Sequence, residues 1–197
     1  LDAFTEDIFS KKPPLAKPVL ESEQQADTDA FESFIILDSQ SRGKSQVSVP
    51  ADLYLCDDCL AELNDPTDRR HRYPFINCTQ CGPRYTLIKS LPYDRANTTM
   101  AAFKLCPDCL AEYQDPLDRR FHAEPVACPQ CGPSLSFIYR KKKIINNNAL
   151  ALKKAVDVLR EGRIVAVKGI GGYHLMCDAS NAIAVSRLRE KKTRPDK

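Results

Sequence analysis

Apolar residues recur with a helical period in the last quarter of the chain. Over residues 149–160 they fall on one face of a predicted helix, and a run of four apolar residues at 164–167 predicts a buried strand. Asn148 can cap that helix, and Gly162 can end it at the C′ position. A second helix is predicted over residues 181–191. Together these elements predict an α/β region that begins at residue 149.

Three other stretches follow different patterns. Residues 1–30 are rich in proline at first and acidic later, which predicts an extended or mobile linker with too few apolar residues for its own core. The apolar run at 34–37 predicts a strand over residues 31–38, which leads into residues 46–50. Residues 140–148 are basic and then rich in asparagine, so they predict a connector to the α/β region.

Cysteines organise the region between residues 31 and 139. Eight of the nine cysteines form Cys-x-x-Cys pairs, and the pairs make two sets with the spacing Cys-x2-Cys-x18-Cys-x2-Cys. The sets are Cys56, Cys59, Cys78 and Cys81, and then Cys106, Cys109, Cys128 and Cys131. The ninth, Cys177, is predicted to be a small core residue rather than a nucleophile.

The two cysteine sets belong to a tandem repeat. Between residues 56–83 and 106–133, 16 of 28 positions are identical, which indicates duplication. Each copy predicts a short helix that ends at Asp65 or Asp115, because both precede a proline and that position disfavours the helical conformation. A unit this small buries little apolar surface, so metal binding is expected to supply much of its folding free energy.

The spacing predicts two structural zinc sites. A Cys-x-x-Cys turn points two thiolates at one ion, and two such turns complete a tetrahedral site with no open position for substrate or water. Gly82 and Gly132 are expected to let the backbone fold back under the metal. Redox dithiols and disulfides are the alternatives. The spacing permits each site to form within one repeat or by exchange between the two.

Other polar residues of the repeats have simpler interpretations. The runs Asp68-Arg69-Arg70 and Asp118-Arg119-Arg120 could grip a phosphate or a partner carboxylate, but a local ion pair or a solvated loop is favoured. His71 and His122 are expected at the surface or in packing, because each site already has four cysteines.

Composition narrows the classes of function. The net charge of +3 comes without a clustered basic stripe, so a nucleic-acid partner is not expected. No apolar run approaches the roughly 18 residues of a membrane-spanning helix, and the first residues lack a signal-peptide pattern. A cytoplasmic location is therefore expected, where reducing conditions favour metal binding over disulfides. Because the chain does not begin with Met, we expect it to be a piece of a longer protein.

A glycine-rich segment follows the predicted strand. Gly169, Gly171 and Gly172 could bring backbone amides close to a phosphate, since glycine has no side chain to block the approach. A flexible strand-helix loop is an equal alternative. The basic string at 191–197 reads, from the residues alone, as a solvated helix end whose charge complements the helix dipole.

Several strings of residues together resemble one enzyme family. They are Tyr-Pro-Phe-Ile-Asn-Cys-Thr-x-Cys-Gly-Pro-Arg at 73–84, Leu-Pro-Tyr-Asp-Arg-x-x-Thr-Thr-Met at 91–100, Asp-Arg-Arg-Phe-His-Ala at 118–123 and Lys-Gly-Ile-Gly-Gly-Tyr-His-Leu-x-Cys-Asp-Ala at 168–179. The chain is similar in these strings to the HypF family, the carbamoyltransferases of [NiFe]-hydrogenase maturation. The resemblance implies an α+β fold class, with tandem small four-cysteine zinc-finger units followed by an incomplete α/β YrdC-like domain.

The resemblance also sets the expected domain boundaries. Residues 1–30 would be a linker after a missing acylphosphatase-like domain, and residues 31–139 a zinc-finger region with units at 56–81 and 106–131. Residues 140–148 would connect it to the start of a YrdC-like domain at 149–197. A C-terminal transferase domain would be missing, so the chain alone is expected to be inactive and to hold no catalytic residue.

For the longer protein the resemblance implies an activity. Family members use carbamoyl phosphate and ATP, pass through a carbamoyl-adenylate, and carbamoylate the C-terminal cysteine of HypE for the cyanide ligands of the hydrogenase iron. Two structural zinc ions are implied here. The implied nucleotide or carbamoyl-phosphate contacts are Lys168, Gly171, Gly172, Tyr173, Lys192 and Arg194. Lysine and a guanidinium fork suit phosphate oxygens. The alternative function is a zinc-ribbon module that binds nucleic acid or protein.

Overall fold

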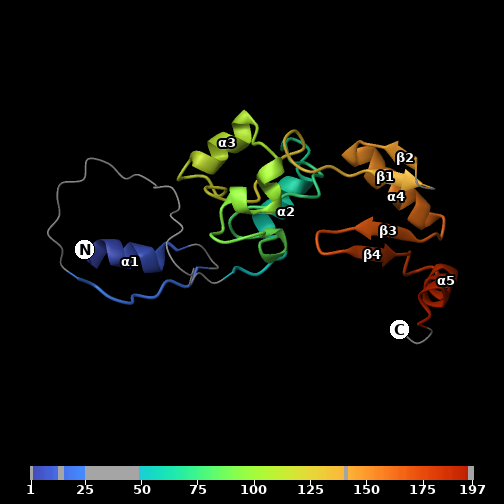
Figure 1. The fold of residues 1–197 in the computed structure, drawn as a ribbon, viewed down its shortest axis with the longest axis horizontal. Coiled ribbons are helices and arrows are strands. Elements are labelled where there is room, and N and C mark those ends of the chain that lie inside the picture. The colour runs from blue at the N-terminus through green and yellow to red at the C-terminus, as the bar shows by residue number, and fades with distance from the viewer. Residues whose placement is uncertain (1, 13–15, 25–48, 140–141, 195–197) are drawn as a thin grey trace.

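The computed structural model describes residues 2–12, 16–24, 49–139 and 142–194, and Figure 1 shows their path. The strand predicted over residues 31–38 lies outside the described residues, as does most of the segment that leads from it into residue 50. No helix among the described residues is long and apolar enough to cross a membrane.

The first described element is a helix, α1 (Asp2–Ser10), where an extended linker is predicted. That prediction is wrong for this stretch. The helix carries local contacts four residues apart: Lys11 Nζ lies 2.7 Å from Asp7 Oδ2, and Ser10 Oγ donates a hydrogen bond to Glu6 O at 2.8 Å. The average composition of thirty residues hides such a local pattern.

Each repeat begins with one short helix, α2 (Asp57–Asn64) in the first and α3 (Pro107–Gln114) in the second. Both helices end at the predicted aspartates, where Asp65 and Asp115 adopt extended backbone angles. Cys56 and Cys106 are the N-caps. The first cysteine pair of each repeat therefore lies at a helix N-terminus, where the helix dipole favours negative charge.

The segment between the repeats contains three 3-10 helices, η1 (Tyr85–Leu87), η2 (Arg95–Asn97) and η3 (Thr99–Ala102). Leu87 and Met100 from this segment are buried. They complete the larger core cluster of the molecule, whose buried members are Cys59, Tyr73, Ile76, Cys78, Cys81, Leu87, Met100 and Ala127. The connection between the repeats is thus part of the core of the first one.

After the second repeat, β1 (Phe137–Tyr139) pairs antiparallel with β2 (Lys142–Ile145). The segment predicted as a connector over residues 140–148 thus contains β2 and the first residue of α4. A strand of four residues forms because it pairs with a neighbouring strand, here β1. The sequence of two isoleucines after a run of lysines does not predict that pairing.

The rest of the chain consists of α4 (Asn148–Arg160), β3 (Val165–Lys168), β4 (Tyr173–Met176) and α5 (Ala182–Lys192). The N-cap of α4 is Asn147, whose side chain accepts a hydrogen bond from the Leu150 N–H at 3.1 Å, one residue before the predicted cap. Asn148 Oδ1 instead accepts from the Leu135 N–H at 2.6 Å and ties the helix to the preceding loop.

Strands β3 and β4 form an antiparallel hairpin with Lys168 opposite Tyr173. The glycine segment is the turn of this hairpin, and the Gly169 N–H donates to the Gly172 carbonyl at 2.7 Å. The predicted strand-helix loop is wrong here, because β4 lies between the glycines and α5. Helices with small two-stranded sheets confirm the α+β class for the described residues.

Candidate functional site

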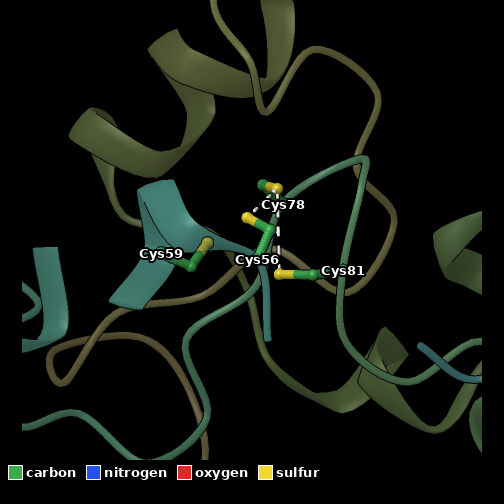
Figure 2. Close-up of side chains that lie close together, drawn as sticks. All are labelled: Cys56, Cys59, Cys78 and Cys81. Carbon is green, nitrogen blue, oxygen red and sulfur yellow. Dashed lines mark hydrogen bonds between the residues drawn. The ribbon is translucent and has the colours of Figure 1, made fainter. Parts of the chain in front are cut away.

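The four cysteines of the first repeat come together at the start of α2. Cys56 and Cys59 lie on the first turn of the helix, and Cys78 and Cys81 reach them from the loop that returns to it (Figure 2). The sulfur of Cys78 lies 3.6 Å from that of Cys56 and 3.8 Å from that of Cys81. Cys59, Cys78 and Cys81 have no exposed surface.

The second repeat builds the same arrangement from Cys106, Cys109, Cys128 and Cys131. The sulfur of Cys128 lies 3.7 Å from that of Cys106 and 3.8 Å from that of Cys131. Each group of four comes from a single repeat, so the ligands are not exchanged between repeats. We call the two units the first finger (residues 56–83) and the second finger (residues 106–133).

The sulfur spacing fits a tetrahedral ion and does not fit disulfides. A metal–sulfur distance of about 2.3 Å in a tetrahedron gives edges of about 3.8 Å, close to the four distances found. A disulfide would need about 2.05 Å. Both groups of four cysteines are therefore suited to hold one metal ion each, and are consistent with two zinc ions.

Four sulfurs this close cannot all ionise by themselves. Hydrogen bonding to Cys78 and Cys81 raises the pKa of Cys59 far above its ordinary value, while hydrogen bonds from Cys59 and Cys78 lower the pKa of Cys81. In the second finger, burial raises the pKa of Cys109. A divalent cation among the sulfurs would remove this conflict, because it stabilises every thiolate at once.

Arginines cross from each finger to the cysteines of the other. Arg69 of the first finger has both terminal nitrogens 3.4 Å from the Cys109 sulfur of the second. Arg119 of the second finger has Nη1 3.2 Å from the Cys59 sulfur of the first. A local ion pair or a solvated loop is predicted for these arginines, and this prediction is wrong in one respect. The arginines do form ion pairs, but with glutamates of the opposite finger: Arg69 with Glu112, and Arg119 with Glu62.

The neighbouring arginines, Arg70 and Arg120, are almost completely buried and pair with glutamates of the opposite finger. Arg70 donates through two nitrogens to Glu112, at 2.9 and 2.5 Å, and its Nε donates to the Ala127 carbonyl at 2.9 Å. Arg120 makes the equivalent pair with Glu62. Two parallel N–H bonds to one carboxylate fix both the distance and the orientation of the fingers.

These ion pairs shift the acidity of the glutamates. Burial alone would raise the pKa of Glu112, but the hydrogen bonds from Arg70 and Arg69 outweigh it and hold the pKa at about 2. The pKa of Glu62 is lowered in the same way: burial opposes the shift, and the hydrogen bonds from Arg120 and Arg119 outweigh it. Both carboxylates are therefore ionised at neutral pH and remain paired.

Backbone and glycine contacts extend the contact between the fingers. Thr79 donates through its N–H and its hydroxyl to the Arg119 carbonyl, at 3.3 and 3.0 Å. Tyr73 Oη donates to the Pro133 carbonyl at 3.0 Å, and a Cβ on Gly132 would lie 2.2 Å from that Oη. Gly132 is thus required by a close approach, whereas Gly82 has a positive φ of 94°.

The crossed arginines line a cleft of about 620 Å³ between the fingers. Its lining includes the four arginines and four carboxylates, namely Glu62 and Glu112, which pair with the arginines, and Asp68 and Asp118. Because the guanidinium groups are already engaged, the cleft resembles a neutral ion-pair network more than an anion-binding site.

Sequence reasoning missed two features of the fingers. Arg72 and His122 occupy the same position in the two repeats and both have a positive φ, 56° and 48°. Each N–H bonds back to the helix of its own repeat, to the Leu63 or the Tyr113 carbonyl. Histidine is enriched at positive φ but arginine is not, so only the equal offset of fifty residues could have suggested that the two positions share a backbone role.

The second missed feature is a group of hydrogen bonds that joins the segment between the repeats to the second finger. Arg95 donates to the carbonyls of Phe103, Glu124 and Val126 at 2.6–2.9 Å, and the Glu124 carboxylate accepts from the Arg95 N–H and the Tyr113 hydroxyl. Burial raises the pKa of Glu124. No spacing rule points to this contact, because the two residues lie 29 positions apart.

The predicted nucleotide contacts are distributed over two elements. Lys168 and Tyr173 face each other across the hairpin, and the lysine Nζ lies 5.5 Å from the centre of the tyrosine ring. Lys192 lies at the end of α5, and Arg194 follows it. A second cleft, of about 640 Å³, runs along α5, and Arg194 is the member of the predicted set among its lining residues.

Family models match both halves of the described chain. A model described as "HypF finger" matches residues 55–88 and again 105–138. A model of the Sua5/YciO/YrdC family, described as "Telomere recombination", matches residues 157–197. The two finger matches cover the two four-cysteine groups, and the third match covers the β3–β4 hairpin and α5.

Curated relatives match almost the whole chain. "Carbamoyltransferase HypF" of Synechocystis sp. is 56% identical over 98% of this chain and 25% of its own length. "Probable carbamoyltransferase HypF" of Methanocaldococcus jannaschii is 50% identical over the same shares of the two chains. The chain therefore spans about a quarter of the length of these relatives.

Solved structures agree with the sequence matches. A crystal structure described as full-length HypF in the phosphate- and nucleotide-bound form has a TM-score of 0.85 and 45% identity, over 98% of this chain and 25% of that one. T. kodakarensis HypF has a TM-score of 0.84 and 47% identity, over 100% of this chain and 24% of that one. With the high sequence identity, these findings show that the chain belongs to the HypF family, as two HypF fingers followed by a Sua5/YrdC-like region.

Proposed function

We propose that this chain is the metal-binding scaffold and part of the nucleotide-binding unit of an ATP-dependent carbamoyltransferase. The observation that carries the proposal is the pair of HypF finger matches within a chain 56% identical to a protein named carbamoyltransferase HypF. In this reaction carbamoyl phosphate, water and ATP give a carbamoyl-adenylate, inorganic phosphate and pyrophosphate. The carbamoyl group then passes to the sulfur of the C-terminal cysteine of HypE with release of AMP, a step towards the cyanide ligands of [NiFe]-hydrogenase.

We propose that the two four-cysteine groups hold one zinc ion each. Sulfur spacings of 3.6–3.8 Å support a tetrahedral all-thiolate site, and both groups lie largely out of solvent. Four thiolates fill the coordination of zinc, so the ion's part is to hold the two ends of each finger together. The chain's own arginines compensate the negative charge of the thiolates.

The nucleotide contacts form a separate proposal. Lys168, Gly171, Gly172 and Tyr173 on the hairpin, with Lys192 and Arg194 after α5, would contact the phosphates of ATP or carbamoyl phosphate. In support, a solved relative with a TM-score of 0.85 is described as phosphate- and nucleotide-bound. Lysine supplies a point charge to phosphate oxygens, and arginine a bidentate donor. The chain alone is proposed to be inactive.

Exchange of pyrophosphate into ATP tests the carbamoyltransferase proposal in the intact protein. We expect exchange to require carbamoyl phosphate, and exchange that proceeds equally without it would overturn the proposal. Lys168→Met should reduce the exchange rate roughly ten-fold, because a charge-assisted hydrogen bond to phosphate is lost. Lys153→Met is the matched control, since Lys153 is an exposed lysine on α4 whose only described role is a pair with Asp157.

Metal analysis tests the zinc sites and separates them from the alternative of a nucleic-acid module. Protein purified under reducing conditions should contain two zinc ions per chain, and protein with none and with disulfides would contradict the assignment. Salt-sensitive binding of DNA or RNA at micromolar affinity would favour the alternative. The pairing of the four finger arginines with glutamates argues against it.

A further inference from the structure

The crossed arginines connect the two four-cysteine groups, and the inference about them rests on the proposed metal binding. Arg69 lies in the loop between the cysteine pairs of the first finger, yet its guanidinium contacts Cys109 of the second. Arg119 lies in the equivalent loop of the second finger and contacts Cys59 of the first. The contacts join residues that lie 40 and 60 positions apart in the sequence. The negative charge of each cysteine group is therefore compensated in part by an arginine of the other finger.

The second arginine of each pair is buried and reaches the same sulfur as the first: Arg70 Nη2 lies 3.5 Å from the Cys109 sulfur, and Arg120 Nη2 lies 4.0 Å from the Cys59 sulfur. Arg70 and Arg120 are 1% and 3% exposed, and each is anchored by a glutamate of the opposite helix and by a backbone carbonyl. Glu112 also lies 2.6 Å from Arg69 Nη2, so one carboxylate orients both guanidinium groups towards Cys109. The arrangement repeats at Glu62 with the arginines of the second finger.

The charge of a loaded site explains why these contacts matter. Four thiolates around one divalent ion carry a net charge of about −2, and a buried net charge is costly unless it is paired. N–H groups directed at ligating sulfurs supply that pairing, and loss of such outer contacts typically weakens metal binding by about 10- to 100-fold. In this molecule the N–H groups that reach Cys59 and Cys109 belong to the opposite finger.

Metal binding in one finger is therefore expected to favour metal binding in the other. The arginine-bearing loop of the first finger is held at both ends by its own cysteine pairs, so an ion there fixes the loop that presents Arg69 to the second group. The second finger does the same for the first through Arg119. We propose that the two centres bind their metal ions cooperatively, because each finger supplies the arginines that neutralise the thiolate cluster of the other.

Cadmium-113 NMR on the full chain loaded with cadmium tests the crossed contacts. The wild type should give two signals, assigned by the loss of one in Cys109→Ser. We expect Arg69→Gln to shift the signal of the second finger, which it contacts, and to leave that of its own finger nearly unchanged. Arg119→Gln should do the reverse. A change confined to the substituted residue's own finger, or no change at all, would overturn the inference.

Two control variants separate charge neutralisation from simple stability. Arg72→Gln removes an exposed arginine from the same loop and should leave both signals in place. Glu112→Gln weakens the carboxylate that orients both guanidinium groups but removes no group that touches sulfur. It should therefore shift the signal of the second finger less than Arg69→Gln does. A shift equal to or larger than that of Arg69→Gln would show that the packing between the fingers, and not the N–H contact to sulfur, sets the signal, and the inference fails.

A cadmium titration in competition with a chelator tests the coupling itself. The wild type should take up both ions in one cooperative step, and Arg69→Gln with Arg119→Gln should take them up in two independent steps, each weaker by about 10- to 100-fold. Two bound ions with independent uptake in the wild type would overturn cooperativity while leaving the metal sites intact. Failure to bind two ions would overturn both proposals.

Discussion

In the first finger, Cys59, Cys78 and Cys81 share a buried cluster with Tyr73, Ile76 and two residues of the segment between the repeats. In the second finger the corresponding buried cluster contains cysteines alone. The positions that match Tyr73 and Ile76 are Ala123 and Val126, which are buried but smaller. Yet the crossed arginine–glutamate pairs are the same in both fingers.

This difference shows which part of a duplicated unit is free to change. The cysteines, the crossed arginines and the glutamates that pair with them are identical in the two copies, since a tetrahedral group of four sulfurs and a reciprocal contact both depend on their geometry. The packing residues differ, because only one finger needs to carry the shared core. The second finger therefore depends more on metal and on its partner, and the first finger more on apolar burial.

Removal of a metal ligand should have the largest effect and should show this asymmetry. Cys59→Ser and Cys109→Ser each remove one thiolate, and structural zinc binding is worth about 10–16 kcal/mol in finger peptides. We expect Cys59→Ser to abolish cooperative unfolding, because it disrupts the larger core, and Cys109→Ser to leave a residual transition from the first finger. Thermal unfolding by circular dichroism measures this. Equal loss in both variants would contradict the unequal-core comparison.

Breaking a crossed ion pair should be the next largest effect and should be symmetrical. Arg70→Met leaves Glu112 without its buried partner, and Arg120→Met does the same to Glu62, at about 3 kcal/mol each. Urea unfolding of the zinc-loaded protein gives the values. Glu112 keeps Arg69 as a partner in Arg70→Met, so adding Glu112→Met should restore little of the loss, because it takes that carboxylate away from Arg69. A loss of stability in only one of the two variants, Arg70→Met or Arg120→Met, would show that the two ion pairs are not equivalent.

Acid should weaken the protein through the same glutamates. The pKa of Glu112 is about 2 in the folded chain and has an ordinary value of 4.5, so the unfolded chain binds more protons between these limits. Stability is thus fully present above about pH 5 and falls as the pH drops towards 2, by on the order of 2 kcal/mol for this group.

The comparison of the wild type with Glu112→Gln isolates this effect. Protonation of the metal-bound thiolates also destabilises the protein in acid, but it affects both proteins and cancels in the difference. The free energy of unfolding should therefore converge for the two proteins as the pH falls. A constant difference from pH 7 to pH 3 would exclude Glu112 as the titrating group.

The two glycines after the cysteines should differ in how they can be rescued. Gly132→Ala should cost about 2 kcal/mol because its Cβ would lie 2.2 Å from Tyr73 Oη, and Tyr73→Phe should recover part of this loss. Gly82→Ala should cost a similar or larger amount, because its φ is 94° and its Cβ would also lie 2.7 Å from Asn77 Cβ, and no change of neighbour should recover the backbone part of that cost. Unfolding midpoints of the four variants measure both effects. Rescue of neither glycine would place the cost of Gly132→Ala at Ala127, whose Cβ would lie 2.5 Å from the added methyl group.

Local signals in the sequence were sufficient for several elements. The proline after Asp65 and Asp115 predicted the ends of α2 and α3, and the helix predicted over residues 181–191 agrees within one residue with α5. Composition averaged over thirty residues failed at α1, and a basic run hid strand β2. Strand β4 was missed because glycines on one side of a segment do not reveal that it pairs with the strand before them.

By itself the sequence determined the two four-cysteine units, their duplication and the family, because these depend on spacing and identity along the chain. Tertiary structure alone decided that each set of four closes within its own repeat and that the arginines reach the opposite finger. The reason is physical: a Cys-x-x-Cys turn is a local geometry, whereas the contact between Arg69 and Cys109 depends on how two separately folded loops pack. The duplication gave both fingers the same cysteines and arginines. The packing between the fingers directs each arginine to a cysteine of the opposite finger.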